Sequence, residues 1–466
     1  MVCPALLPSC SAYVANQHWG VCLPAGSSST TTIINVSQPC AHNGNIKIGG
    51  SQPLSIPAYV ENVYELLGTA DDGHPGDFYL DAAEGALFYI PREGETANST
   101  VGHLPVVESL IIATGVSAVT YSNITFEHAT WLHPNTRGFV DIQGGYTINC
   151  EVSDPCGNGG AGGPGQAFET PAALQFQQSN HVSFVGCTFQ HLGSNGVGFT
   201  RGSHNNSVSR CTFVDISASA VAIGTRDNPT NKTTPEKQDL WNTVSDCTIS
   251  KIAQEYRGHP GLLVGFTRGT TLTHNEIAHV PYSGISVGWG WSAFPHTYDG
   301  LNTVTNNHIH HHMQVLGDGG AIYTLGAQGN LPFLNRSSNT SVILPPSVQT
   351  GNWIHDGGTH ATAVLDHGGI GEGSHGPGGL YTDEGSTNWQ LQHNVVQEVL
   401  LWLQGCRPGC AWIGPMWYWN NWYDKASANT MNVEARCPLI NDVEIIPPAM
   451  FPAAALAVQA AAGPRH

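Results

Sequence analysis

The sequence predicts an all-β protein built as a right-handed parallel β-helix, with a small β-rich accessory element on its N-terminal side. Glycine is abundant, with 55 residues among 466. Charged residues make up only 11% of the chain. A short strand pattern recurs between turns of Gly, Asn, Ser and Thr, which is typical of many short strands joined by tight turns.

Four segments follow in order. Residues 1–56 are rich in Cys, Ser, Thr and Pro without periodicity, which predicts an irregular segment or the remnant of a truncated upstream domain. Residues 57–112 change to short alternating strands with a hairpin turn near "AAEG", which predicts a small β-rich accessory element. Residues 113–425 carry an internal repeat and form the predicted β-helix, and residues 426–466 form a C-terminal tail.

The repeat places eight segments in one frame, among them "FVGCTFQHL", "VSRCTFVDI", "LTHNEIAHV" and "VTNNHIHHH". The shortest spacings between copies, 24 and 28 residues, correspond to about one coil of a parallel β-helix, and the longer spacings must carry loops. One coil is too small to bury its own apolar face, so stacking the coils at roughly 4.8 Å per layer makes a continuous core.

One column of the repeat changes from cysteine to asparagine along the chain. We expect the cysteines to point inward as small buried apolar side chains, and the asparagines to form a hydrogen-bonded ladder. A metal site at the cysteines is not expected, because no CxxC or paired-His spacing accompanies them. The column reads Ile124, Cys187, Cys211, Cys247, Asn275, Asn307, Asn352 and Asn394.

A second strand of each coil carries the candidate catalytic residues. Aligning "SGISVGW", "GAIYTL" and "GGLYTD" puts Ile285, Ile322 and Leu380 in one inward column. Ser286, Tyr323 and Tyr381 lie beside them, so the two tyrosines are candidate substrate contacts. Asp318 precedes its own strand and Asp383 follows the next one, so we expect both acids on the same face of neighbouring coils.

Two neighbouring carboxyl groups are what glycosidic bond cleavage needs. One carboxylic acid protonates the leaving oxygen, and the other carboxylate attacks the anomeric carbon or activates water. Asp318 and Asp383 are therefore the catalytic candidates. Glu384 is the next candidate if the alignment of the strands is wrong by one residue. Glycines 317, 319, 320, 378, 379 and 385 would let a sugar approach the backbone. Gly-Asp runs are also ordinary turn chemistry.

Aromatic and histidine residues add further candidates for binding substrate. Trp289 and Trp291 precede Asp318 by one coil and would form a stacking platform for sugars, or else cover the core at the rim. His310 and His355 occupy equivalent places in successive coils and would line the groove. Strand alternation splits the run "HIHHHM" between two faces, and no acid completes a ligand set at fixed spacing, so we predict no metal site and no cofactor.

Charge and cysteine content limit the partners and the compartment. With 34 acidic and 16 basic side chains, the formal net charge of -18 disfavours nucleic acid and anionic membranes as partners. A polysaccharide or oligosaccharide partner is compatible with this negative charge. The alternative is that the acidic side chains serve only to keep the protein soluble. Twelve cysteines and seven Asn-x-Ser/Thr sequons indicate a secreted or extracellular glycoprotein. The first residues lack a signal-peptide pattern, so we expect a truncated start.

Several motifs in order, including "GFVDIQGGY", "YSGISVGWGW", "GDGGAIYTLGAQ" and "LYTDEGSTNW", resemble the secreted β-helix proteins of glycoside hydrolase family 141. The resemblance covers roughly residues 57–425. It implies a right-handed, pectate-lyase-like solenoid with a β-sandwich elaboration, and an activity such as α-L-fucosidase on pectic side chains or endo-xylanase. The paired aspartates of that family carry over to Asp318 and Asp383.

The leading interpretation is a glycoside hydrolase that acts as a monomer on a plant or algal cell-wall polysaccharide. Two other functions compete with it. A polysaccharide lyase would need a Ca²⁺ cluster and a Lys or Arg base, and basic residues are scarce near the acid pair. A non-catalytic carbohydrate-binding or structural solenoid would use the two aspartates only as turn residues.

Overall fold

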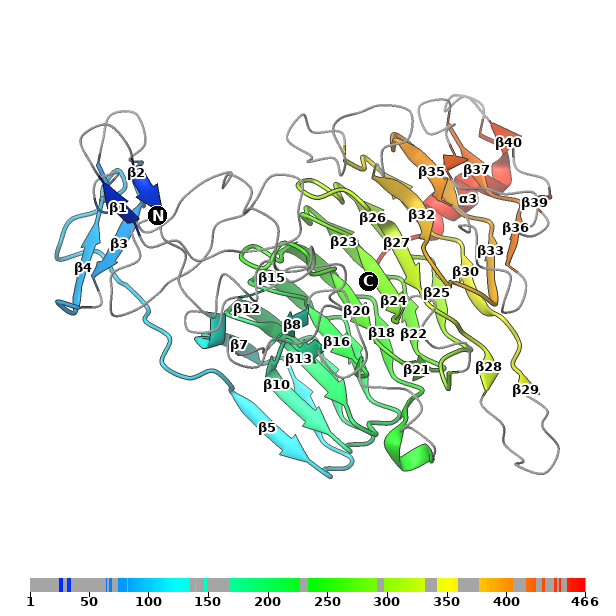
Figure 1. Cartoon of the computed structure of the whole chain (residues 1–466), viewed down its shortest axis with the longest axis horizontal. Helices are drawn as coiled ribbons and strands as arrows, with labels where there is room; N and C mark the ends of the chain where they lie inside the picture. The colour runs from blue at the N-terminus through cyan, green and yellow to red at the C-terminus, as the bar shows by residue number, and fades with distance from the viewer. Residues whose placement is uncertain are drawn as a thin grey trace. The chain divides into compact units, whose positions relative to one another are not determined.

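The computed structural model shows a parallel β-helix, drawn in Figure 1. The residues that it describes are 25–27, 32–34, 64, 67–68, 74–81, 83–134, 139, 146–148, 167–226, 234–290, 297–331, 342–358, 377–404, 416–424, 430–431, 440–441, 444–445 and 451–465. The contacts between residues divide the chain into two compact units. The first is Met1–Val106, Trp131–Ile142 and Tyr146–Ala167, and the second is Val107–Thr130, Gln143–Gly145 and Phe168–His466.

Three parallel sheets of ten described strands each make up the β-helix, and all of them belong to the second unit. The chain visits the first, second and third sheet in turn, once in each coil. Neighbouring coils pair in parallel register, for example Ser183 with Ser207 and Thr243 with Thr271. The paired residues are 24 and 28 positions apart in the chain, which are the spacings of the repeat. The predicted parallel β-helix is therefore confirmed.

In each sheet the strands stack in the order of the chain. The first sheet contains β5 (Ile111–Thr114), β10 (Ala172–Gln177), β13 (Asn195–Thr200), β16 (Val221–Ile223), β20 (Leu262–Val264), β24 (Ile285–Gly288), β27 (Gly320–Leu325), β32 (Gly378–Thr382), β35 (Leu401–Gln404) and β38 (Thr430–Met431). The second contains β6 (Thr120–Ser122), β11 (Ser183–Val185), β14 (Ser207–Ser209), β18 (Thr243–Ser245), β22 (Thr271–Thr273), β25 (Thr303–Thr305), β30 (Ser347–Thr350), β33 (Trp389–Gln392), β36 (Trp417–Trp419) and β39 (Ile440–Asn441). The third contains β7 (Thr125–Ala129), β12 (Thr188–Leu192), β15 (Thr212–Ile216), β19 (Thr248–Ile252), β23 (Glu276–Ala278), β26 (His308–His310), β31 (Trp353–His355), β34 (Val395–Val396), β37 (Trp422–Tyr423) and β40 (Glu444–Ile445).

The other elements are short. Antiparallel pairs are β1 (Ala25–Ser27) with β2 (Thr32–Ile34), β3 (Phe78–Asp81) with β4 (Ala86–Tyr89), and β28 (Asn330–Leu331) with β29 (Val342–Ile343). β17 (Asp239–Leu240) pairs in parallel with β21 (Thr267–Arg268). The remaining elements are β8 (Tyr146–Ile148), β9 (Ala167–Glu169), a 3-10 helix (Pro235–Lys237) and α3 (Ala453–Ala461). Neither described helix has the length and apolarity to cross a bilayer.

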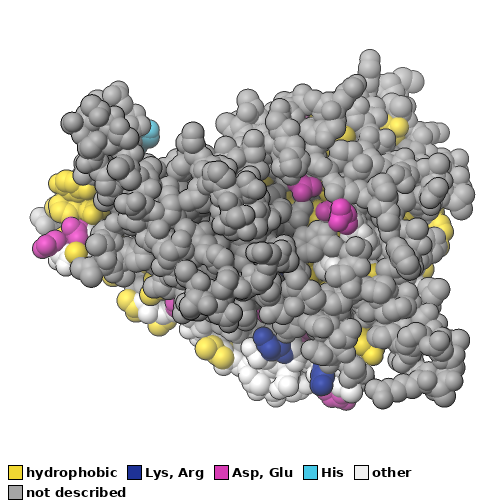
Figure 2. All heavy atoms as spheres, in the orientation of Figure 1, with side chains coloured by type: hydrophobic (Ala, Val, Ile, Leu, Met, Phe, Trp, Pro, Cys, Tyr) yellow, Lys and Arg dark blue, Asp and Glu magenta, His cyan; other side chains and the backbone are white. Residues whose placement is uncertain are grey.

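The β3–β4 hairpin forms where the sequence predicted a turn. It exposes large apolar side chains, with Phe78 at 64% and Leu87 at 61%. Figure 2 shows hydrophobic side chains where Figure 1 draws β3 and β4. The segment boundaries at residues 56, 112 and 425 stay predictions.

The core is a set of side-chain columns that run along the stack. Phe189 stacks on Phe126 with ring centroids 5.3 Å apart and on Phe213 at 4.5 Å. Burying one such ring contributes roughly 1.5–3 kcal/mol. Cys187, Cys211 and Cys247 are free thiols at most 1% exposed, so the prediction that they act as buried apolar side chains is confirmed.

Asparagines continue the cysteine column as a ladder through the interior. Each side-chain amide donates to the Oδ1 atom of the next asparagine, at 2.9–3.0 Å, from Asn275 through Asn307 and Asn352 to Asn394. Each Oδ1 also accepts a backbone N–H of the preceding layer. The ladder is confirmed and extends one coil further than predicted, to Asn421, which accepts from Asn394.

A buried histidine in the same unit makes stability depend on pH. His259 is 0% exposed and lies 3.2 Å from the hydroxyls of Thr170 and Ser219. Burial, and then the charge of Arg226, hold the pKa of His259 well below its ordinary value of 6.5. The imidazole is therefore neutral in the folded chain, whereas the unfolded chain binds a proton below about pH 6.5.

Lowering the pH from 7 to 5 is expected to reduce the free energy of unfolding, because the unfolded state then binds more protons. His259 alone contributes a slope of up to about 1.4 kcal/mol per pH unit below its ordinary pKa. Urea denaturation at several pH values gives the free energy of unfolding as a function of pH. The slope of that function should be shallower for His259→Gln than for the wild type. His191→Gln, at a histidine whose side chain is 47% exposed, is the control. Equal slopes in His259→Gln and wild type would contradict the assignment.

Candidate active site

The predicted register of the first sheet is confirmed. Ile285, Ile322 and Leu380 pair in succession and are fully buried in the core. The neighbouring positions on the outer face are Ser286, Tyr323 and Tyr381, which also pair in succession. The two tyrosine rings stack with centroids 5.5 Å apart and an interplanar angle of 23°.

Both tyrosines hydrogen-bond to the predicted acids, and the bonds connect neighbouring coils. The Tyr323 hydroxyl on β27 donates to Oδ2 of Asp383, which follows β32, at 2.5 Å. The Tyr381 hydroxyl on β32 donates to Oδ1 of Asp318, which precedes β27, at 2.6 Å. Asp383 is 4% exposed and Asp318 is half-buried. Each aspartate is therefore held by a tyrosine of the other coil.

The electrostatics link these four residues into one group. Burial, followed by the charge of Asp383, raises the pKa of Tyr323 well above its ordinary value. Burial, followed by the charge of Asp318, raises the pKa of Tyr381 in the same way, and both tyrosines feel both carboxylates. The hydroxyls therefore keep their protons at neutral pH and act as donors.

Backbone contacts position the two acids. Asp318 has a positive φ of 53°, a conformation that Asp adopts more readily than most residues. Its carbonyl accepts from the Tyr282 hydroxyl at 2.7 Å. The N–H of Asp383 donates to the carbonyl of Thr324 at 2.9 Å, which continues the register beyond β32. Glu384 is half-buried, and its carbonyl accepts from the Gly326 N–H.

Two of the glycines around the acids have another role than the one expected. A Cβ atom at Gly320 would lie 2.8 Å from the carbonyl oxygen of Gly378 and 2.8 Å from Cβ of Tyr381. A Cβ atom at Gly319 would lie 2.7 Å from the Tyr282 ring. The space beside Gly319 and Gly320 is filled by neighbouring coils, so these two glycines permit close stacking of the protein rather than the approach of a sugar.

The other predicted binding residues differ in where they lie. Trp289 is 4% exposed, and the guanidinium of Arg226 lies over its ring at 5.1 Å from the centroid. Trp291 lies outside the described residues. His310 and His355 pair across β26 and β31 as predicted, and their rings stack 5.1 Å apart, but these strands belong to the third sheet. Their roles as substrate contacts stay predictions.

A pocket of about 150 Å³ lies over the earlier coils of the first sheet. It was not predicted from the sequence, although small residues at Gly198 and Ala222 on the outer face were a signal. Gln175, Gly198, Ala222 and Leu263 line it, and the same row continues through Ser286 to Tyr323 and Tyr381. Its charged lining residues are Glu169, Arg201 and Arg226.

No family model and no curated protein matches this chain. A solved structure named "Glycoside hydrolase" is similar, with 23% identity, a TM-score of 0.67, and coverage of 97% of this chain and 69% of that one. A second, named "The complex structure of XylC with xylose", has 8% identity, covers 81% of this chain and 65% of its own, and has a TM-score of 0.38, too low to indicate a shared fold. The chain is thus a parallel β-helix protein with the fold of a structure named as a glycoside hydrolase.

Proposed function

We propose that this chain is a glycoside hydrolase that cleaves O-glycosidic bonds in a plant or algal cell-wall polysaccharide, with Asp318 and Asp383 as its catalytic carboxyl groups. The observation that carries the proposal is the crossed pairing of these two aspartates with Tyr381 and Tyr323. Glycoside hydrolysis uses two carboxyl groups that flank the scissile bond, and the pairing of these two acids on adjacent coils supports that role.

One aspartate protonates the leaving oxygen, and the other attacks the anomeric carbon or activates a water molecule. The tyrosine hydroxyls orient the carboxyl groups, because their raised pKa values keep them as hydrogen-bond donors. The resemblance to glycoside hydrolase family 141 favours an α-L-fucosidase or xylanase type of substrate. The similar structure named "Glycoside hydrolase" supports the same class of reaction.

The substrate lies along the outer face of the first sheet in this proposal. Ala222 in the pocket is three strands from Tyr323 along one row, which is roughly 14 Å at about 4.8 Å per strand. Ser286, which lies between the pocket and Tyr323, is only 2% exposed, so the open part of this row is the pocket itself. The charged groups of Arg201 and Glu169 in the pocket suit a polar chain.

Secretion as a glycoprotein belongs to the same proposal. Three sequon asparagines fall in described residues, Asn98, Asn123 and Asn205, and all three are exposed. An exposed sequon is what glycosylation of a secreted protein needs.

The test is sugar release from a panel of cell-wall polysaccharides, comparing the wild type with the double variant Asp318→Asn/Asp383→Asn. We expect the wild type to release reducing sugars and the double variant, still folded, to release none. If the products instead carry a new carbon–carbon double bond, and adding a chelator stops their formation, the protein is a lyase. Tight glycan binding by both proteins without cleavage would identify a binding solenoid.

A further inference from the structure

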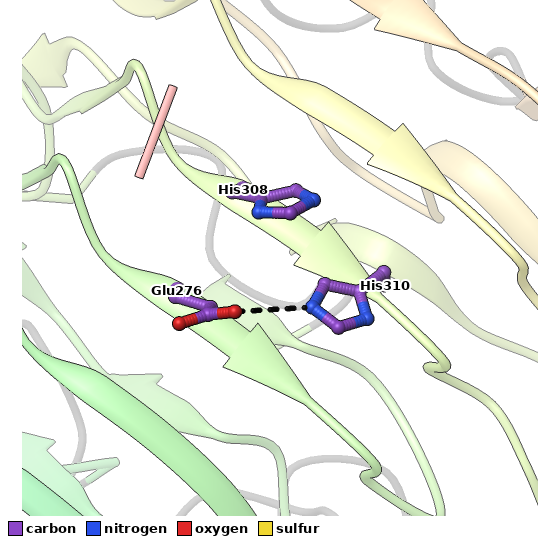
Figure 3. Close-up of side chains that lie close together, drawn as sticks. All are labelled: Glu276, His308 and His310. Carbon is purple, nitrogen blue, oxygen red and sulfur yellow. Dashed lines mark hydrogen bonds and ion pairs between the residues drawn. The ribbon is translucent and has the colours of Figure 1, made fainter. Parts of the chain in front are cut away.

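A second cluster of polar side chains lies on the outer face of the third sheet, apart from the strands that carry the acid pair. Glu276 on β23 pairs with His308 on β26, and His310 pairs with His355 on β31. Ile309 between the two histidines is buried in the core, so His308 and His310 share the outer face. Figure 3 shows the Glu276 carboxylate and the His310 ring directed toward each other, with the His308 ring beside them.

The donor atoms are close enough for one ion. One ligand atom from each of Glu276, His308 and His310 lies within 4.8 Å of the other two. Nε2 of His310 is 3.4 Å from Oε1 of Glu276. The donors of a tetrahedral zinc site lie roughly 3.3–3.5 Å apart, so small side-chain rotations would complete such a site. The expectation of no metal here rested on the lack of an acid at fixed spacing, but the acid comes from the preceding coil.

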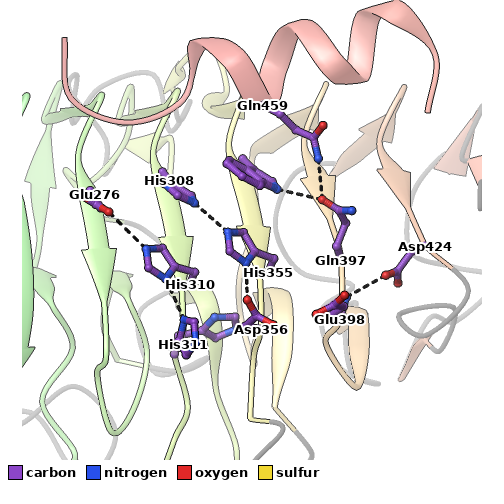
Figure 4. Close-up of polar contacts among 12 residues, drawn as sticks. Glu276, His308, His310, His311, His355, Asp356, Gln397, Glu398, Asp424 and Gln459 are labelled. Atoms are coloured by element: carbon purple, nitrogen blue, oxygen red, sulfur yellow. Dashed lines mark hydrogen bonds and ion pairs between the residues drawn. The ribbon is translucent and has the colours of Figure 1, made fainter. Parts of the chain in front are cut away.

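His355 is not among the three residues whose donor atoms lie within 4.8 Å of one another, but it contacts His308 and is itself oriented by Asp356. Nε2 of His355 lies 2.8 Å from Nε2 of His308, and Nδ1 of His355 lies 2.7 Å from Oδ2 of Asp356 (Figure 4). A histidine whose Nδ1–H donates to a carboxylate presents the lone pair of Nε2, so His355 can accept from the Nε2–H of His308 and hold that ring in place from outside the donor set.

The rings are already held in place by packing. His308 stacks on Trp353 with centroids 4.2 Å apart and an angle of 2°, and His310 stacks on His355 at 4°. Side chains that are fixed before binding lose little conformational freedom when a ligand arrives.

We infer that Glu276, His308 and His310 bind one divalent transition-metal ion of the zinc class, which ties together the coils of β23 and β26. Imidazole and carboxylate donors suit Zn²⁺, Co²⁺, Ni²⁺ and Cu²⁺, whereas Ca²⁺ and Mg²⁺ prefer oxygen ligands alone. The site does not depend on the proposed glycosidase activity, because its strands belong to a different sheet from β27 and β32.

The test uses the full chain without an affinity tag, stripped with a chelator and dialysed against Zn²⁺ or Co²⁺ alone. We expect one tightly bound ion per chain, a cobalt absorption spectrum of tetrahedral type, and a Zn²⁺-dependent rise in Tm. Ca²⁺ should produce none of these effects.

Three variants locate the ion. Glu276→Gln and His310→Gln are expected to lower Zn²⁺ affinity at least about 10-fold, and Asp356→Asn about 10- to 100-fold through the orientation of His355. Asn is also compatible with the positive φ of Asp356, 51°. His191→Gln is the matched control, because His191 on β12 also pairs with a carboxylate, Asp215, at 2.7 Å. No ion bound to the wild type, or equal affinity in Glu276→Gln and wild type, would overturn the inference.

Discussion

Replacing either Asp318 or Asp383 with asparagine is expected to lower kcat/KM for the cleaved glycan by about 10²- to 10⁴-fold, because each removes one of the two proton-transfer or nucleophilic groups. Asparagine has nearly the same shape, and its amide oxygen still accepts the hydrogen bond from Tyr381 or Tyr323. The fold should therefore survive, as circular dichroism and Tm would verify.

Substrates with different leaving groups separate the two roles. An aryl glycoside with an acidic phenol needs no protonation, so it should restore cleavage in the variant that lacks the general acid, but not in the other. Asp215→Asn is the control, because Asp215 also has a φ of 53° but its side chain is 54% exposed on the third sheet. Wild-type kinetics in both active-site variants would exclude these aspartates from catalysis.

Replacing Asn307 with alanine is expected to lower the free energy of unfolding by roughly 2–6 kcal/mol, the largest stability effect that we predict. The Asn307 side chain accepts from the N–H and the side-chain amide of Asn275 and donates to the carbonyl of Leu272. Its removal takes this partner from the Asn275 N–H and the Leu272 carbonyl, whereas the Asn275 side-chain amide keeps its bond to the Val244 carbonyl. Each of the two buried groups that lose a partner costs about 1–3 kcal/mol.

Chemical denaturation measures this loss directly. Asn420→Gly is the matched control, because Asn420 is exposed and has a φ of 52°, which glycine adopts without strain. We expect that change to alter stability by less than about 0.5 kcal/mol. A loss below about 1 kcal/mol for Asn307→Ala would mean that water or a shifted neighbour replaces the ladder at this layer.

The elements of the β-helix could be predicted because its register follows a simple rule. Side chains alternate between inside and outside along each strand, and the repeat returns the same position in each coil. Equivalent residues of successive coils, such as Ile322 and Leu380 or Asn307 and Asn352, therefore fall into columns that the sequence itself reveals. The same rule placed Tyr323 beside Tyr381 and His310 beside His355.

The contacts between columns could not be predicted in this way. The repeat placed Asp318 and Asp383 near one face, but side-chain torsions and the positive φ of Asp318 decide that each aspartate meets the tyrosine of the other coil. The burial of Trp289 beneath Arg226 depends on packing between coils. The group of Glu276, His308 and His310 needs an acid from a neighbouring strand, which no spacing within one motif reveals.

The sequence by itself thus determined the parallel β-helix, the inward columns and the two coils that carry the acids, because periodic burial of apolar side chains dominates the energy of folding. Only the tertiary structure decided which outward side chains touch. Hydrogen bonds such as Tyr323 to Asp383 join residues that are distant in the chain and depend on the geometry of turns, which periodicity does not encode.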